Sequence, residues 1–295
     1  MKTYIVNCTL GYLFNGLDVR HLDGNAALSL CQRVTNRICA SSEVPENLEV
    51  YKQLGDADIV ILFGGTKHFI DRSLHIQQYV PSTAMLHLYL WNPINYYQDN
   101  IHLLDARWNV WSFSKEDADK NQIGYAETFY NKSLVIKGDV CTDLFFVGLG
   151  KDRVSQILEI QEIAKRQRLN ADINIVDNLK RLYDSRYVKR LSYDEVRSRV
   201  AKTKAIIDIV QSGQSGMTQR VMEALFFKKK LVTNNSYIKE YPFYTPENVF
   251  IIGEDKWESL SEFVNAPYSE TPFDESIYDV RNWLYRICQK ANFHG

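Results

Sequence analysis

The stretch that decides the fold is Ala205–Asn234, AIIDIVQSGQSGMTQRVMEALFFKKKLVTN. Its first apolar run, Ala205–Val210, predicts a buried strand, and two glycines then turn the chain into a helix predicted over Met217–Phe227. A second apolar run, Leu231–Thr233, predicts the next strand. Strands that are almost continuously apolar are typical of a parallel sheet that helices cover on both faces.

The same alternation of strand and helix extends in both directions from this stretch. In the second half, strands are predicted at Asp143–Val147, Asp172–Val176, Ala205–Val210, Leu231–Thr233 and Val249–Ile252. Helices are predicted there at Asp152–Arg168, Tyr193–Lys202, Met217–Phe227, Glu254–Asn265 and, as an amphipathic segment, Glu275–Ala291. In the first half, strands are predicted at Tyr4–Cys8, Ile59–Phe63, Met85–Leu90 and Asn109–Phe113. Helices are predicted to begin after the N-cap residues Asp23 and Ser114.

These patterns predict an α/β protein with two Rossmann-like, doubly wound lobes that face a central cleft. The first lobe is predicted over residues 1–138 and the second over residues 139–273. A further amphipathic segment lies within residues 274–295.

Composition excludes several classes of protein. The 295 residues carry 35 Lys and Arg against 36 Asp and Glu, so no basic surface for non-specific nucleic-acid binding is expected. The hydrophobic content of 45% is that of a globular protein, and no apolar run approaches the ~20 residues of a membrane-spanning helix. The predicted location is the cytoplasm, with peripheral attachment to the inner face of the membrane left open.

Two loops carry the residues that suit a phosphate ligand. In each, a predicted strand runs into a glycine-bearing turn and then a helix, and in parallel sheets ligands lie at such carboxyl strand ends. Backbone N–H groups, hydroxyls, cations and a helix N-terminus would all face an anion there. The first loop contains Gly148, Lys151 and Arg153, and the second contains Ser215, Gly216, Met217 and Thr218. A glycine turn that only begins a helix, or a solvated charged helix start, is the simpler alternative for each loop alone.

At these residues the sequence resembles a family, the bacterial GT-B-fold glycosyltransferases of lipopolysaccharide, capsule and exopolysaccharide biosynthesis. The second half carries the resemblance in FFVGLGKDR (Phe145–Arg153), IIDIVQSGQSGMTQRVMEAL (Ile206–Leu225) and KKLVTNNSYIKEYPFYTPENVFII (Lys229–Ile252). The first half adds LWNPI (Leu90–Ile94) and VWSFSKEDADKN (Val110–Asn121).

The resemblance implies transfer of a sugar from a nucleotide diphosphate donor, most simply a UDP-hexose, to a saccharide acceptor that could be lipid-linked. It places the donor diphosphate on the two glycine-bearing loops and the donor ribose on Glu223. It also implies that the final helix, within residues 274–295, crosses back to the first lobe. One departure matters: retaining members carry a glutamate at the position of Ser215, which puts a retaining mechanism in doubt. Tyr187 and Arg190 are candidates for contact with the nucleotide base.

An inverting reaction needs a base on the acceptor side. Candidates are His68, after the Gly64-Gly65-Thr66 turn, and Asp18 or Asp23 in the loop after the first strand. A surface position for His68 and an N-cap role for Asp23 are the simpler alternatives.

Further candidates concern the sugar and the leaving group. Trp91 directly follows a predicted strand and could stack on a sugar ring, and Gly65 would let the backbone approach the acceptor. No metal or cofactor is expected, because cations and helix dipoles stabilise a leaving diphosphate. The two Asp-x-Asp strings, Asp56–Asp58 and Asp117–Asp119, precede a strand and open a helix, so both are expected to be structural.

Two other functions stay open. A sugar-nucleotide epimerase of similar design would use the same diphosphate loops. A non-catalytic sugar-nucleotide-binding or scaffold subunit would keep the fold without turnover. The run Phe226–Lys230 (FFKKK) also allows membrane contact, but lysines complement a helix C-terminus and the phenylalanines are expected to pack inward.

Overall fold

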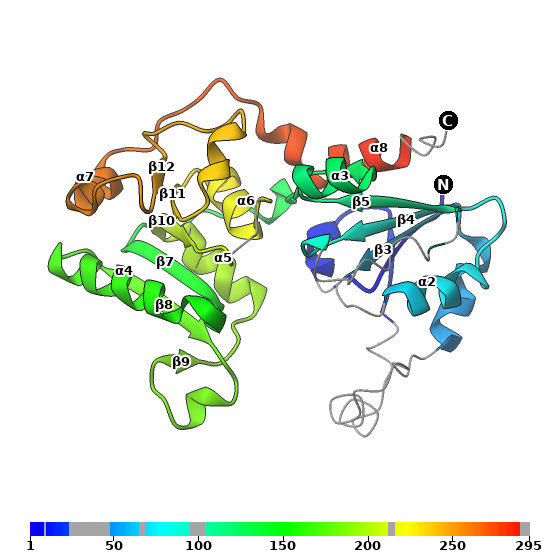
Figure 1. Cartoon of the computed structure of the whole chain (residues 1–295), viewed down its shortest axis with the longest axis horizontal. Helices are drawn as coiled ribbons and strands as arrows, with labels where there is room; N and C mark the ends of the chain where they lie inside the picture. Colours follow the sequence, from blue (N-terminus) through cyan, green and yellow to red (C-terminus); the bar gives the residue numbers. More distant parts are fainter. Residues whose placement is uncertain are drawn as a thin grey trace. The chain divides into compact units, whose positions relative to one another are not determined.

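The computed structural model describes residues 1–8, 10–23, 48–64, 69–94, 104, 106–211 and 216–289. The chain divides into two compact units, which Figure 1 colours along the sequence. Unit 1 consists of Met1–Glu127 and Val280–Gly295, and unit 2 of Thr128–Asp279. The chain thus passes from one unit to the other at 127/128 and 279/280, where sequence analysis placed these passages at 138/139 and 273/274.

Each unit is built on one six-stranded sheet whose paired strands all run parallel. The strands of unit 1 lie in the order β2-β1-β3-β4-β5-β6 and those of unit 2 in the order β12-β11-β10-β7-β8-β9. The expected class, α/β with two doubly wound lobes, is therefore confirmed. In unit 1 the strands are β1 (Thr3–Val6), β2 (Arg20–Leu22), β3 (Ile59–Gly64), β4 (Met85–Leu90), β5 (Trp108–Ser112) and β6 (Gly124–Tyr125). In unit 2 they are β7 (Thr142–Leu149), β8 (Ala171–Val176), β9 (Tyr187–Val188), β10 (Thr203–Asp208), β11 (Lys230–Thr233) and β12 (Val249–Ile251).

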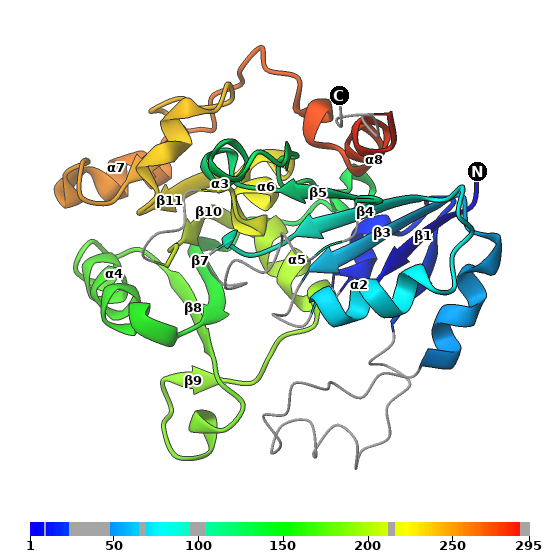
Figure 2. The same ribbon diagram turned by 45° about the vertical axis from the view of Figure 1, so that its right-hand side comes forward.

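Helices lie on both faces of each sheet, as Figures 1 and 2 show. In unit 1, α2 covers one face and α3 and α8 the opposite face. In unit 2, α4 and α7 share one core with β7 and β10, and α5 and α6 pack on β10 from the other side. The helices are α2 (Phe69–Gln77), α3 (Lys115–Asn121), α4 (Val154–Arg166), α5 (Tyr193–Ala201), α6 (Gln219–Phe226), α7 (Leu260–Asn265) and α8 (Val280–Gln289).

The last helix, α8, belongs to unit 1, as the family resemblance of the sequence implies. Its central residue Trp283 is fully buried, and its ring packs against Phe14, Phe63 and Tyr89 at centroid distances of 6.3, 6.1 and 5.0 Å. Alternate residues of each strand point to opposite faces, so Phe63 and Tyr89 face α8 while their neighbours enter the core beneath α2. The expectation that the final helix returns to the first lobe is confirmed.

Two predicted helices are shorter than expected. Of Glu254–Asn265, only Leu260–Asn265 (α7) is an α-helix. Before it, the Asp255 side chain turns back to β12, where its Oδ2 accepts a hydrogen bond from Ile251 N (2.6 Å). Of Glu275–Ala291, the described part is a 3-10 helix, η10 (Glu275–Tyr278), followed by α8. Asp279 breaks the pattern because it is extended and bridges to Tyr130. The helix expected after Asp23 lies outside the described residues.

Sequence analysis missed three strands because each is too short to show a periodic pattern. They are β2, β6 and β9, with three, two and two residues, and each is an edge strand of its sheet. The capping interaction expected at Ser114 is present, since its side chain accepts a hydrogen bond from Asp117 N at 3.2 Å.

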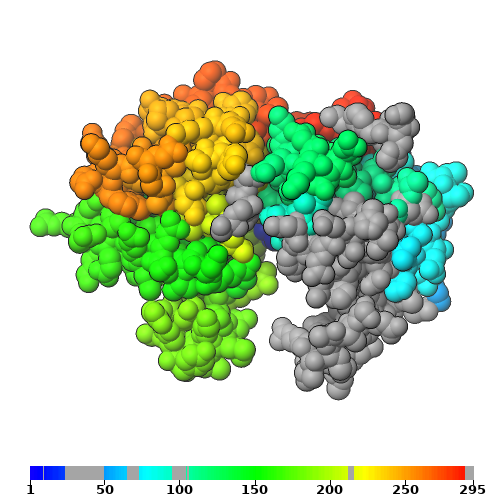
Figure 3. Space-filling model, viewed as in Figure 1, coloured from blue at the N-terminus to red at the C-terminus, as the bar shows by residue number. Residues whose placement is uncertain are grey.

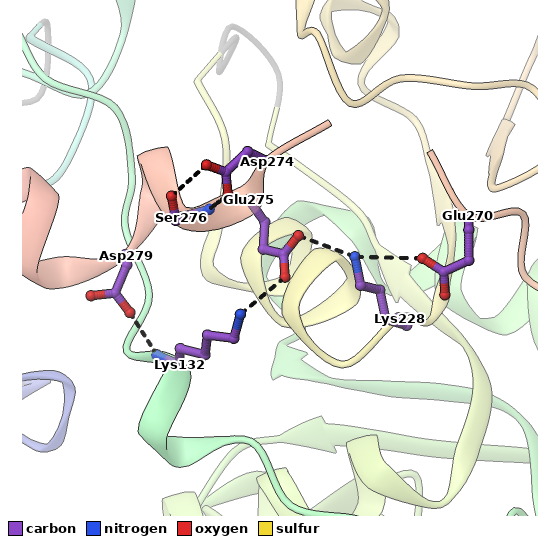
Figure 4. A network of polar contacts seen from close by, with 7 residues as sticks. All are labelled: Lys132, Lys228, Glu270, Asp274, Glu275, Ser276 and Asp279. Atoms are coloured by element: carbon purple, nitrogen blue, oxygen red, sulfur yellow. Dashed lines mark hydrogen bonds and ion pairs between the residues drawn. The ribbon is translucent and has the colours of Figure 1, made fainter. Parts of the chain in front are cut away.

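Within unit 2, the segments next to the two passages are held together by a polar network (Figure 4). Lys132 N donates to Asp279 Oδ2 (3.1 Å), and Lys132 Nζ lies 3.4 Å from Glu275 Oε1. The other oxygen of Glu275 lies 3.2 Å from Lys228 Nζ, just beyond the C-terminus of α6. Glu275 thus links the segment that enters unit 2, the segment that leaves it, and α6.

The side chains of the run Phe226–Lys230 make contacts within unit 2. Phe226 and Phe227 are buried and pack against the ring of Tyr130, as expected. Lys229 and Lys230 donate to the carbonyl oxygens of Ala201 and Phe263, near the C-termini of α5 and α7, where a cation complements the helix dipole. No helix in the described part of the chain has both the length and the apolar run that crossing a membrane requires.

Candidate functional site

The strand order of unit 2 defines where a ligand would bind. From β7 the chain moves outward to β8 and β9, and from β10 it moves outward in the opposite direction to β11 and β12. The order therefore reverses between β7 and β10, and in open parallel sheets such a switch point is where ligands bind, at the carboxyl ends of the strands. The two glycine-bearing loops predicted from sequence follow these two strands.

The loop after β7 is compact and needs its glycines. A Cβ atom on Gly150 would lie 2.6 Å from Val154 Cγ2 and 3.1 Å from Ile175 Cγ2, so only glycine lets α4 approach the sheet this closely. Lys151 follows in a left-handed conformation (φ 45°), which is uncommon for a residue with a side chain. The chain then forms the 3-10 helix η6 (Lys151–Arg153) and enters α4. Lys151 is exposed at the start of η6.

Arg153 joins the ends of the two switch-point strands. Its Nε and Nη2 donate to Leu149 O at 3.1 and 3.0 Å, and its Nη1 donates to Ile209 O, just after β10. A Cβ atom on Gly148 would lie 3.3 Å from Arg153 Nη2, so the guanidinium group lies beside that glycine. Arg153 is therefore a fixed cation at the switch point, with two of its five N–H hydrogens not used in these bonds.

The second loop leads to the N-terminus of α6. Thr218 is the N-cap, and its hydroxyl oxygen accepts hydrogen bonds from the amides of Arg220 (3.1 Å) and Val221 (3.4 Å). Gly216 and Met217 are buried, and the Met217 carbonyl accepts a 2.6 Å hydrogen bond from Thr128 Oγ1. The positive end of the α6 dipole therefore lies at the switch point. Ser215 lies outside the described residues.

Asp208 is a site residue that sequence analysis missed. It is the last residue of β10 and is 3% exposed. Its Oδ1 accepts a hydrogen bond from Thr218 Oγ1 at 2.9 Å. Burial raises its pKa to about 6, although Thr218, Arg220 and Arg153 all favour the charged form. The sequence signal for this site residue was a carboxylate inside the apolar run AIIDIV, because burying a charged group costs free energy unless it has partners or a function.

Glu223, the expected ribose contact, is fully buried on α6. Its Oε2 lies 2.5 Å from Arg220 Nη1, and the two form an ion pair. Burial raises the pKa of Glu223 to about 7, while Arg220 and the Tyr193 hydroxyl act in the opposite direction. Glu223 thus belongs to the same buried charge cluster as Asp208, and its pKa is raised further by that neighbour.

The two residues expected at the nucleotide base lie beyond β8. Tyr187 is in β9 and is 9% exposed, with its ring packed in the core and Lys180 Nζ 5.2 Å from the ring centroid. Arg190 is exposed, and its backbone N donates to Asn178 Oδ1. The segment around β9 stands out from the rest of unit 2 in Figure 3. Leu182 and Tyr183 on this segment are 70% and 78% exposed, and sequence analysis gave them no role.

The candidate residues of unit 1 lie at different edges of its sheet. Asp18 precedes β2 and lies toward the amino edge, where its charge acts on Arg20. Asp23 directly follows β2 at the carboxyl edge and is exposed. His68 and Gly65 lie outside the described residues.

Trp91 follows β4 at the carboxyl edge of the same sheet and is partly exposed. Its ring lies 5.5 Å from both Phe63 and Tyr89 in edge-on geometry. Trp91 is therefore held by an aromatic cluster while part of its indole stays accessible.

One carboxylate of each Asp-x-Asp string is held by neighbours within unit 1. Asp56 accepts hydrogen bonds from Lys2 and Tyr4 at the amino edge of unit 1, and Asp117 Oδ2 accepts one from Ile94 N (2.9 Å). Within the residues that the structure describes, no three His, Cys, Asp or Glu side chains come together to hold a metal.

The comparisons with known proteins give only distant likenesses. No protein-family model and no curated protein matches the sequence. The fold is similar to that of TarM (11% identity, TM-score 0.49), with 84% of this chain and 59% of that chain covered, so this chain spans less than two thirds of TarM. It is also similar to the glycotransferase of kitacinnamycin (11% identity, TM-score 0.41, 90% of each chain covered).

A third likeness is to D-lactate dehydrogenase from Escherichia coli (8% identity, TM-score 0.22), with 90% of this chain and 93% of that chain covered. At these values the likenesses do not decide what this chain binds or does.

Proposed function

We propose that this protein is a glycosyltransferase that binds a nucleotide diphosphate sugar at the switch point of unit 2. The supporting observation is that Arg153, the Gly148–Arg153 turn and the N-terminus of α6 all lie at the carboxyl ends of β7 and β10. A diphosphate suits such a set of N–H dipoles and cations. A UDP-hexose is the proposed donor, from the resemblance of Phe145–Arg153 and Ile206–Leu225 to the family named above.

The proposed reaction breaks the bond between the anomeric carbon and the diphosphate oxygen, and the bonding electrons remain on the diphosphate. Arg153, Lys151 and the α6 dipole stabilise that charge, so we propose that no divalent metal is needed. A hydroxyl of a saccharide acceptor attacks the anomeric carbon and loses its proton to a base. Of the two described candidates for that base, the carboxyl-edge position of Asp23 suits the role better than the amino-edge position of Asp18.

On the acceptor side we propose Trp91 as the platform for a sugar ring, because its indole is held in place by two neighbouring rings and stays partly accessible. The proposed acceptor is a growing surface-polysaccharide intermediate, lipid-linked or free, at the cytoplasmic face of the membrane. His68 and Gly65 remain proposed acceptor-side residues.

A thermal-shift panel of nucleotides and nucleotide sugars tests the donor site, since a ligand that binds only the folded state raises the melting temperature. We expect UDP and a UDP-hexose to raise it, with no change on addition of a chelator. Lys151→Gly, which keeps the left-handed backbone but removes the cation, should reduce the shift, and Arg153→Ala should abolish it. Arg166→Ala, an exposed arginine at the end of α4, is the matched control and should leave the shift unchanged.

Product analysis then separates the enzyme classes. Transfer of the sugar to an added saccharide supports the proposal. Conversion of the donor without an acceptor would replace it with an epimerase, and binding without turnover over a broad acceptor panel would leave a binding subunit.

A further inference from the structure

A buried carboxyl group lies at the switch point of unit 2, where the proposed donor would bind. Asp208 ends β10 at the switch point and is 3% exposed. Oδ1 is bound to the Thr218 hydroxyl, whereas Oδ2 is buried with no hydrogen-bond partner in the part of the chain that the structure describes. Buried polar atoms without partners are rare and need an explanation.

The charges around Asp208 come from two elements. Arg153 on η6 and Arg220 in the first turn of α6 favour its charged form. Glu223, one turn further along α6, is a second buried carboxyl of this cluster, and the charge of Asp208 raises the pKa of Glu223. Burial outweighs both arginines, so the pKa of Asp208 is raised to about 6 and the group titrates near neutral pH. An added diphosphate would bring further negative charge and would favour the protonated form still more.

We propose that Asp208 is a proton-linked positioning residue of the donor site: it takes up one proton from solvent when a nucleotide diphosphate binds. The proton forms an O–H bond at Oδ2, because Oδ1 already accepts the Thr218 hydrogen bond. The neutral acid keeps Thr218 oriented as the N-cap of α6 and no longer repels the phosphates. The new O–H at Oδ2 can also donate a hydrogen bond to a phosphate oxygen, which would give this oxygen a partner. This inference rests on the proposed donor site.

Proton uptake has a defined signature. If binding takes up one proton, affinity falls by up to about tenfold for each pH unit above the pKa of the free protein. A UDP-hexose is a suitable probe, because both its phosphates are esterified and it lacks the terminal phosphate group that titrates near pH 6 in a phosphate monoester. The pH dependence of its binding therefore reports on the protein.

The experiment is calorimetric titration of the protein with a UDP-hexose at pH 6 and pH 8, in buffers of different ionisation enthalpy. The wild type should bind more weakly at pH 8, with a buffer-dependent heat that corresponds to uptake of up to one proton. Asp208→Asn, which is neutral and keeps an acceptor for Thr218, should bind with a flatter pH dependence and little buffer-dependent heat. Glu223→Gln removes the other buried carboxyl of the cluster. Because Glu223 is also the expected ribose contact, this variant is compared with itself at the two pH values, and its proton uptake should persist even if its affinity is lower.

Each outcome is decisive. A pH dependence that survives in Asp208→Asn and disappears in Glu223→Gln would overturn the assignment to Asp208 and leave the donor site intact. Absence of binding by any nucleotide sugar in the wild type would overturn the donor site and this inference together. If Asp208→Asn does not fold, the buffer-dependent heat of the wild type still decides, since no proton uptake contradicts the proposal.

Discussion

The two sheets share an architecture, but different types of residue lie at their carboxyl edges. In unit 2 the edge is charged, with Asp208 and Arg153 between β7 and β10. In unit 1 the corresponding edge carries the rings of Phe63, Tyr89 and Trp91, and Trp283 of α8 packs against the first two. One parallel scaffold thus supports an edge suited to an anion and an edge suited to ring packing, and the chemistry lies in the strand-end residues rather than in the fold.

The largest effect is expected where the aromatic edge holds α8. Trp283→Ala would remove a fully buried ring that contacts three others, and we expect a loss of about 3–5 kcal/mol in the free energy of unfolding. Tyr285→Ala on the same helix is the control, because Tyr285 is 62% exposed and should change stability by no more than about 0.5 kcal/mol. Chemical denaturation measures both, and equal losses would contradict the assignment of the buried face of α8.

The charged edge should respond to pH instead. The pKa of Asp208 is raised from 3.8 to about 6, so the folded state binds its proton more tightly than the unfolded state, and stability falls as pH rises through this range. Between pH 4.5 and pH 7.5 this group should lower the free energy of unfolding by about 2 kcal/mol.

The variant Asp208→Asn removes that contribution. Denaturation of wild type and variant at pH 4.5 and pH 7.5 measures the effect. The decrease in the free energy of unfolding that Asp208 causes between these pH values, about 2 kcal/mol, should be absent in the variant. Identical pH profiles would show that Asp208 is not a buried titrating group.

Much of this comparison was predictable from sequence, and the physical reasons are specific. Long apolar strands such as Ile59–Gly64 and the glycine-bearing turn after β7 mark the sheets and the donor loops, because burial and backbone conformation restrict the residue types there. The sequence predicts an apolar face at Ile277, Val280, Leu284 and Ile287, of which Val280 and Ile287 are buried on α8, whereas Ile277 lies in η10 and is 39% exposed. Sequence could not reveal the break at Asp279, which depends on a bridge to Tyr130.

The site residues that sequence analysis missed depend on long-range geometry. Asp208 sits inside an apolar run, and its role follows only from the reversal of strand order that brings Arg153 and Thr218 beside it. Tyr193 on α5 is likewise unremarkable in sequence and reaches Glu223 only through the folded arrangement of unit 2. Arg220, by contrast, lies three residues before Glu223 on α6, so that ion pair is local.

A smaller effect tests the close packing of the donor turn. Gly150→Ala would place Cβ 2.6 Å from Val154 Cγ2, and we expect overpacking to cost about 1–3 kcal/mol and to weaken nucleotide binding by displacing η6. Gly55→Ala in unit 1 is the matched control, because nothing lies within 4 Å of its added Cβ. Denaturation and the nucleotide thermal shift measure the pair, and a Gly150→Ala protein as stable as the control would contradict this account of the turn.

The smallest effect concerns the polar network of Figure 4. Glu275→Gln removes ion pairs of 3.4 Å to Lys132 and 3.2 Å to Lys228, and should cost about 0.5–1 kcal/mol at low salt and less at high salt. Glu270→Gln is the control, since Glu270 is largely exposed and lies 4.0 Å from Lys228. If Glu270→Gln lowers the free energy of unfolding as much as Glu275→Gln does, the specific ion pairs of Glu275 do not contribute beyond its charge.

The most direct test of the central claim is a crystal structure with a bound UDP-hexose. We expect the diphosphate to contact the turn at Gly148–Arg153 and the N-terminus of α6. A nucleotide bound at the amino edge of the unit 2 sheet, or on unit 1 alone, would contradict it.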